Sequence, residues 1–212
     1  KIPITFFAAA TALERNPEVA AWLKEAEHEP CSHGWRWEEV WTLSREEEKQ
    51  HMLWAIESFK RTVGQRPQGW YCRYGPSVHT RELLVEEGGF VYDADAYNDD
   101  LPYFQEVSGK RHLVVPYSFT YNDARFVLAQ GYSSPSDFAD YLKRAFDTYW
   151  EEGAERPRMM SIGLHPRMIG QAARISALKE FIEYALDKGD VWFAKRLDIA
   201  TWWLEHHEEF EA

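Results

Sequence analysis

The segment 29–37 carries the side chains whose types and spacing point most directly to chemistry. It contains His33 and, four residues later, Trp37. Two histidines at that spacing on a helical turn or tight loop point the same way and can share one metal ion. The indole nitrogen of a tryptophan only donates a hydrogen bond and cannot bind a metal. The segment therefore looks like a metal site from which one ligand has been removed.

Three further polar residues follow apolar stretches, namely Arg73, Asp95 and His165. The carboxyl ends of the strands of a parallel barrel converge on one site, so we expect these residues and His33 to contribute to one pocket. His165 is the strongest candidate for catalysis, because an imidazole titrates near neutral pH and can protonate a leaving nitrogen. The alternative for His165 is a hydrogen-bonded core histidine.

Composition limits the class of protein. The chain has 212 residues, enough for one domain, and we expect a single domain over residues 1–212. The formal net charge of -11 disfavours nucleic acids and anionic membranes as partners. No apolar stretch is long enough to cross a membrane. The two cysteines favour free thiols in a reducing compartment, so we expect a cytoplasmic protein.

Strand and helix patterns alternate along the chain, which predicts an α/β fold with a parallel sheet or barrel. Asn16 followed by Pro17 predicts a helix start, and Ser44 with Glu47 has the spacing of a capping box. The helix after Ser44 should bury Leu53, Ile56, Phe59 and Val63, and later helices should begin at Thr80, Ser136 and Ile175. Strands are expected at 4–7, 69–71, 90–92, 113–117, 161–164 and 191–194.

The ordered motifs resemble those of the NodB-type polysaccharide deacetylases, also called carbohydrate esterase family 4. They are a Ser-His near the front, an Arg-containing loop before a proline, an Asp-x-Asp strand and a late Leu-His. The resemblance extends from residue 4 to residue 198. Within the superfamily it is closest to the metal-independent allantoinases and cyclic-amide hydrolases, through the segments 12–17, 69–71, 87–93, 98–103, 159–165 and 196–200.

This resemblance implies a distorted (β/α) barrel of which the chain shows six of seven units. The family's Asp-Asp pair on the first barrel strand has no counterpart, and residues 1–7 resemble the second strand. We therefore expect an N-terminal part, carrying the general base, to be absent from this chain.

The resemblance also implies roles for individual residues. His165 matches the general acid and His33 matches a metal ligand, which here is better suited to hydrogen bonding or acid–base work. Asp95 matches the aspartate that orients an arginine, so we expect it beside Arg73. Trp37 would form a pocket wall where relatives hold a metal, or would pack in the core. Substrate contacts are expected from five more side chains: Tyr71, Tyr74, Tyr97, Asn98 and Asp100.

The implied function is hydrolysis of a non-peptide carbon–nitrogen bond, with a small cyclic amide such as allantoin as the favoured substrate. Three alternatives stay open: a polysaccharide or peptidoglycan N-deacetylase, a cyclic imide hydrolase, and a catalytically inactive binding module. A nucleophilic Cys31, two residues before His33, is a further alternative.

We expect no cofactor, and the alternative is zinc completed by a ligand from the N-terminal part that we expect to be absent. The tryptophans around positions 35–41 and at 202–203 would be costly to expose, so a homo-oligomer is expected, and relatives suggest a tetramer.

Overall fold

A computed structural model describes residues 2–210, which form two compact units. Unit 1 contains residues 2–116 and 193–210, and unit 2 contains residues 117–192. Each unit is described by itself below. The alternation of strands and helices expected from the sequence is confirmed, chiefly in unit 1.

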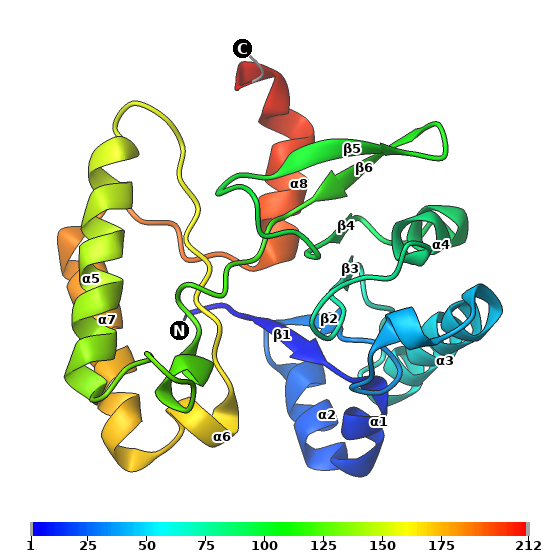
Figure 1. Ribbon diagram of the computed structural model, residues 1–212, viewed down its shortest axis with the longest axis horizontal. Coiled ribbons are helices and arrows are strands. Elements are labelled where there is room, and N and C mark those ends of the chain that lie inside the picture. Colours follow the sequence, from blue (N-terminus) through cyan, green and yellow to red (C-terminus); the bar gives the residue numbers. More distant parts are fainter. Residues whose placement is uncertain (1, 211–212) are drawn as a thin grey trace. The chain divides into compact units, whose positions relative to one another are not determined.

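Unit 1 is built on a six-stranded sheet with the order β1-β2-β3-β4-β6-β5 (Figure 1). All neighbouring strands are parallel except β5 and β6, which form an antiparallel hairpin. The strands are β1 (Thr5–Ala8), β2 (Glu29–Ser32), β3 (Gly69–Trp70), β4 (Tyr92–Asp93), β5 (Tyr103–Val107) and β6 (Lys110–Val114). The helices are α1 (Ala10–Arg15), α2 (Pro17–Glu25), α3 (Arg45–Thr62), α4 (Thr80–Glu87) and α8 (Arg196–His206), with 3-10 turns η1 (Val40–Thr42) and η3 (His207–Glu209).

The capping box at Ser44 is confirmed as the start of α3. The Ser44 backbone N–H donates to Glu47 Oε2 at 2.9 Å, and the Glu47 N–H donates to Ser44 Oγ at 3.3 Å. One face of α3 packs into the core through Met52, Ala55, Ile56 and Phe59. The prediction that Leu53 belongs to this face is wrong, because Leu53 is 40% exposed and Met52 takes the buried position.

A buried carboxylate at the start of β2 ties several elements of unit 1 together. Glu29 accepts hydrogen bonds from Thr5 Oγ1 (2.6 Å), from the Tyr92 hydroxyl (2.7 Å) and from the backbone N–H of Leu197 (2.9 Å). The ring of Tyr92 lies over Gly69, where an added Cβ would come within 2.3 Å of it. A glycine is therefore required at position 69 for β3 and β4 to pair as they do.

Unit 2 is mainly helical. It contains η2 (Asp123–Phe126), α5 (Pro135–Glu152), α6 (Pro166–Ile169) and α7 (Ala172–Lys188). The long helices α5 and α7 lie side by side (Figure 1), and the rings of Phe146 and Phe181 meet edge to face at 5.9 Å. The helix expected from Ser136 begins at Pro135 instead, because the Ser134 hydroxyl accepts from the Asp137 N–H and caps it.

Two predicted strands do not form. Residues 161–164 contribute one isolated parallel bridge, between Gly163 and Asn122, and residues 191–194 are irregular. The antiparallel strand β5 was not predicted. Its turn, Ser108-Gly109, has φ angles of 51° and 73°, the two positive values that a tight hairpin turn requires. None of the helices in residues 2–210 is long and apolar enough to cross a membrane.

Candidate active-site residues

His33 follows directly after β2 and is held in one orientation and one tautomer. Its Nδ1 lies 2.6 Å from the backbone carbonyl oxygen of Tyr71, and its ring stacks on the Tyr71 ring at 5.1 Å with 3° between the planes. A carbonyl oxygen only accepts, so Nδ1 carries the hydrogen of the neutral ring and Nε2 carries the lone pair. His33 can therefore act at Nε2 as a hydrogen-bond acceptor or a base.

Arg73 lies in the loop after β3 between two aromatic rings. Its guanidinium carbon is 4.3 Å from the ring centroids of both Trp37 and Tyr74, and Nη1 is 3.4 Å from Glu39. Such stacking holds the planar guanidinium while leaving N–H groups for a ligand. Trp37 is 51% exposed and Tyr74 is 54% exposed, so Trp37 is not a core residue. The three side chains form a surface that we call the Arg73 stack.

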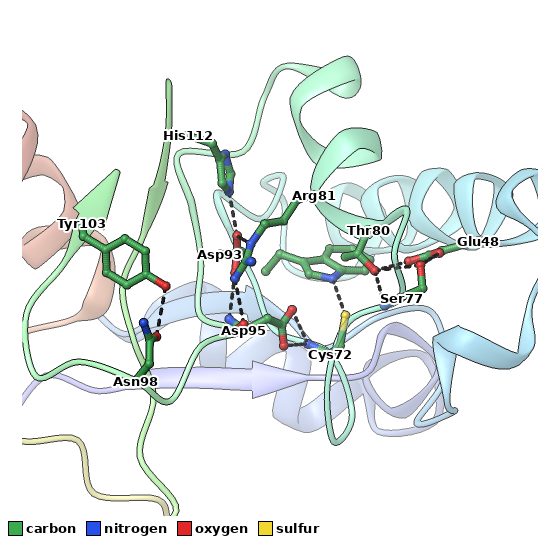
Figure 2. Close-up of polar contacts among 11 residues, drawn as sticks. Glu48, Cys72, Ser77, Thr80, Arg81, Asp93, Asp95, Asn98, Tyr103 and His112 are labelled. Atoms are coloured by element: carbon green, nitrogen blue, oxygen red, sulfur yellow. Dashed lines mark hydrogen bonds and ion pairs between the residues drawn. The ribbon is translucent and has the colours of Figure 1, made fainter. Parts of the chain in front are cut away.

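The expected contact between Asp95 and Arg73 is wrong. Both carboxylate oxygens of Asp95 accept from the backbone N–H of Cys72, at 2.9 and 3.1 Å, so Asp95 orients the loop that precedes Arg73 (Figure 2). The arginine held by the Asp-x-Asp strand is Arg81 of α4. It donates to both oxygens of Asp93 and to the Asp95 carbonyl.

The pKa values of the two aspartates of this strand are shifted in opposite directions. Burial, and then the charge of Asp93, raise the pKa of Asp95 to about 7. Burial also acts to raise the pKa of Asp93, but hydrogen bonds from His112 (2.8 Å) and Arg81 outweigh it, and that pKa lies below the usual range. Asp93 is therefore the charged member of the pair, and Asp95 can hold a proton near neutral pH.

A second buried carboxylate supports the same loop from the other side. Glu48 of α3 is 1% exposed and accepts from the hydroxyl groups of Ser77 and Thr80 (Figure 2). Helix α4 begins at Thr80 as expected, with His79 at the N-cap position, and the Thr80 hydroxyl donates to Glu48. The loop 72–77 is thus fixed at both ends.

The remaining expected substrate contacts lie on unit 1 as well. The Tyr71 and Tyr97 hydroxyls are 3.1 Å apart, and Asn98 accepts from Tyr103 at 3.1 Å. Asp100 is exposed. Tyr71 and Tyr97 therefore extend the polar surface around His33, while Asn98 is engaged with β5.

In unit 2, His165 forms a dyad with a carboxylate that the sequence did not reveal. His165 Nδ1 is 2.6 Å from Asp123 Oδ1, and the backbone N–H groups of His165 and Ile169 donate to Asp123 Oδ2 at 2.8 and 3.1 Å. Asp123 is fully buried. A buried carboxylate that accepts from Nδ1 orients the imidazole and leaves Nε2 to exchange a proton, as in hydrolases with a His–Asp pair.

The donor groups of the described residues do not fit a metal ion. No group of three or more His, Cys, Asp or Glu side chains in residues 2–210 is arranged to hold one. Catalytic zinc usually takes three protein ligands, and position 37, four residues after His33, holds a tryptophan, whose indole cannot bind a metal. The thiol of Cys31 is no better placed as a nucleophile, because it is buried and burial raises its pKa.

Known proteins of one family are similar to this chain. A model of the polysaccharide deacetylase family matches residues 1–92. A Schizosaccharomyces pombe protein described as "Putative polysaccharide deacetylase" is 34% identical over 98% of this chain and 70% of its own length. The chain belongs to the polysaccharide deacetylase superfamily.

Two solved structures of this superfamily are more similar still. A crystal structure of Puue allantoinase has 49% identity and a TM-score of 0.92, over 97% of this chain and 68% of that one. A Pseudomonas aeruginosa structure described as a "probable Polysaccharide deacetylase" has 48% identity and a TM-score of 0.91, over 98% and 69%. The expected fold class, the distorted barrel of this superfamily, is confirmed, and the chain is a carbon–nitrogen hydrolase of that family.

Four site-supporting residues were missed by sequence reasoning: Asp123, Asp93, Arg81 and His112. Asp93 stands two residues before Asp95, and Asp123 follows a Tyr-Asn pair after an aromatic stretch. Both signals were visible, whereas nothing local marks Arg81 or His112 as their partners.

Proposed function

We propose that this protein opens a small cyclic amide, with allantoin as the favoured substrate. The proposal depends mainly on one observation, the type of residue that accompanies His33 at position 37. A deacetylase-type metal would need a second ligand there, and the chain instead places an indole against a guanidinium. The similarity to Puue allantoinase, at 49% identity, supports the same substrate class.

The Arg73 stack suits a flat ureide ring. The exposed rings of Trp37 and Tyr74 offer apolar faces, and the guanidinium can donate to a carbonyl oxygen on which negative charge develops. His33 is assigned a substrate hydrogen bond or a proton transfer at Nε2, because Nδ1 is held by the Tyr71 carbonyl.

Ring opening adds water to the amide carbonyl and breaks the carbon–nitrogen bond. The water oxygen becomes part of a carboxylate, and the departing nitrogen takes a proton. We assign that proton transfer to His165 Nε2, with Asp123 holding the ring through Nδ1. Asp95 positions the loop of Arg73 through Cys72. No residue described here is assigned as the base that activates water.

The deciding experiment measures allantoin hydrolysis by the purified protein with and without a strong chelator, together with metal content in the same sample. We expect turnover that resists the chelator without stoichiometric metal. Absence of allantoin turnover, with tightly bound zinc, would refute the proposal.

The second candidate is a polysaccharide N-deacetylase, favoured by the 48% identity to the Pseudomonas aeruginosa structure. It predicts release of acetate from N-acetylglucosamine oligomers under the same conditions. The small-molecule substrate, the oligomeric state and the cytoplasmic location remain predictions from the sequence.

A further inference from the structure

Unit 1 contains a cavity of about 590 Å³ beside Trp37. Besides two alanines, its lining residues are Thr11, Arg15, Asn16, Arg36 and Trp37. They come from α1, from the residue that follows it and from the turn after β2. No lining residue is acidic, so the cavity has two positive charges and no negative one.

The two lining arginines differ from most arginines of the same unit. Arg45, Arg61, Arg66, Arg73 and Arg81 each pair with a carboxylate. The guanidinium groups of Arg15 and Arg36 make no hydrogen bond or ion pair with any residue that the structure describes. Arg15 and Arg36 are both exposed, so water solvates their guanidinium groups, and both remain open to an anionic ligand.

We propose that this cavity binds a small carboxylate with a flat, ureido-bearing body. The arginines would bind the carboxylate, because a guanidinium fork matches two carboxylate oxygens. The indole of Trp37 offers a flat wall. The side chain of Asn16 donates through Nδ2 to the Ala12 carbonyl, which leaves its amide oxygen to accept from a ureido N–H.

This ligand is the product of the reaction proposed above. Opening a cyclic ureide converts a neutral ring into a carboxylate that keeps its ureido groups, so the cavity selects product over substrate by charge. The identification as product rests on the proposed function, whereas the anion site itself does not. Trp37 belongs to both the cavity and the Arg73 stack, which gives a bound product a route to inhibit the enzyme.

The test is equilibrium binding by calorimetry to the whole protein, with allantoate, allantoin and inorganic phosphate as probes. The variant is R15Q/R36Q. The matched control is K24Q/K110Q, which removes two exposed cations that lie outside the cavity. Circular dichroism verifies that both variants fold.

We expect allantoate to bind the wild type, with a Kd raised roughly tenfold or more in R15Q/R36Q and unchanged in the control. Equal binding by wild type and R15Q/R36Q, or no binding of allantoate at millimolar concentration, would overturn the proposal. Phosphate bound as well as allantoate would refute the preference for a ureido carboxylate. Allantoate binding that depends on the arginines, in a protein that does not hydrolyse allantoin, would remove the proposed function and leave the anion site standing.

Discussion

Asp123 decides which nitrogen of His165 carries the hydrogen of the neutral ring. The carboxylate is fully buried and accepts from Nδ1 and from two backbone N–H groups, so it cannot turn away from the imidazole without losing three hydrogen bonds. A proton donor is useful only when the correct atom holds the proton, which makes this carboxylate part of the chemistry.

We therefore expect Asp123→Asn to lower kcat for ring opening by about 10²- to 10⁴-fold with little change in KM. An amide can present its N–H₂ group to Nδ1, which favours the wrong tautomer. The control is Asp147→Asn on α5, an aspartate of the same unit that accepts from Tyr184 and Lys188. Steady-state kinetics of both variants test this, and a kcat for Asp123→Asn within threefold of wild type would contradict it.

The Arg73 stack leads to a different prediction, because it should bind substrate through shape as well as charge. Arg73→Lys keeps the charge and loses the planar group that lies between Trp37 and Tyr74. We expect kcat/KM to fall by roughly 10- to 100-fold, mainly through KM.

Arg66 provides a matched control for Arg73. It also pairs with a glutamate, Glu87, and lies 5.3 Å from an aromatic ring, that of Phe90. Arg66→Lys should leave kcat/KM nearly unchanged. Equal losses in the two variants would show that the effect is structural and not due to substrate binding.

At the scale of elements, two carboxylates with opposite pKa shifts, those of Asp93 and Asp95, lie at the end of β4. The pKa of Asp95 is raised to about 7 from its ordinary value of 3.8. The native state therefore holds more protons than the unfolded state between these values, and the contribution of Asp95 to stability falls as the pH rises through this range. Asp93 has a lowered pKa, so its contribution is present at neutral pH and is lost as the pH falls.

These signs predict that Asp95→Asn gains stability relative to wild type as the pH rises. Over the range from pH 5 to pH 7 the difference in free energy of unfolding should grow by about 2 kcal/mol, because one pH unit is worth about 1.4 kcal/mol for a full proton and Asp95 is already half deprotonated at pH 7. Asp93→Asn should be destabilised at neutral pH and less so in acid. Urea denaturation across this pH range measures both, and a constant difference between Asp95→Asn and wild type would disprove the assignment.

Helices were easier to predict than strands. The start of α3 could be placed from Ser44 and Glu47 because a cap is a local chemical signal. The strand β5 was missed because Tyr103–Val107 is partly exposed and polar, and its strand structure depends on pairing with β6. Residues 161–164 are as apolar as a strand, yet within residues 2–210 they form a single isolated bridge, from Gly163 to Asn122.

The candidate site could likewise be predicted only in part, because some of its contacts are local and others depend on tertiary packing. His33 and Arg73 line one small cavity of unit 1, and Trp37 lies against the Arg73 guanidinium, since each of these residues stands in a loop that follows a strand. The partner of His165 lies 42 residues before it in the chain, and that of Asp95 lies 23 residues before it. Such pairings depend on tertiary packing, which no local pattern of residues specifies.

At the scale of the whole molecule, the surface of unit 1 presents Trp22, Trp41 and Trp54 with 45%, 47% and 46% of their area exposed. Exposed indoles in such number favour an interface. The expectation that Trp203 needs a partner chain is wrong, because Trp203 is 7% exposed and stacks on Phe210.

We expect the protein to sediment as a homo-oligomer, with a tetramer as the prediction from the sequence. Trp41→Gln combined with Trp54→Gln should shift it to smaller species. The control is Trp192→Gln, which changes an indole that is 59% exposed in unit 2. A monomeric wild type, or an unchanged assembly in the double variant, would contradict this prediction.

The two cysteines of unit 1 have a practical consequence. Cys31 is fully buried and Cys72 is 1% exposed, and burial raises the pKa of both thiols. A thiol-specific reagent therefore cannot label either residue until the chain around it opens. Cys72 directly precedes Arg73, whereas Cys31 is inside β2, so the two labelling rates would time the opening of the loop and of the sheet separately. The two native thiols thus report local opening at two separate places of unit 1, and mass spectrometry of the labelled protein measures both rates without any introduced cysteine.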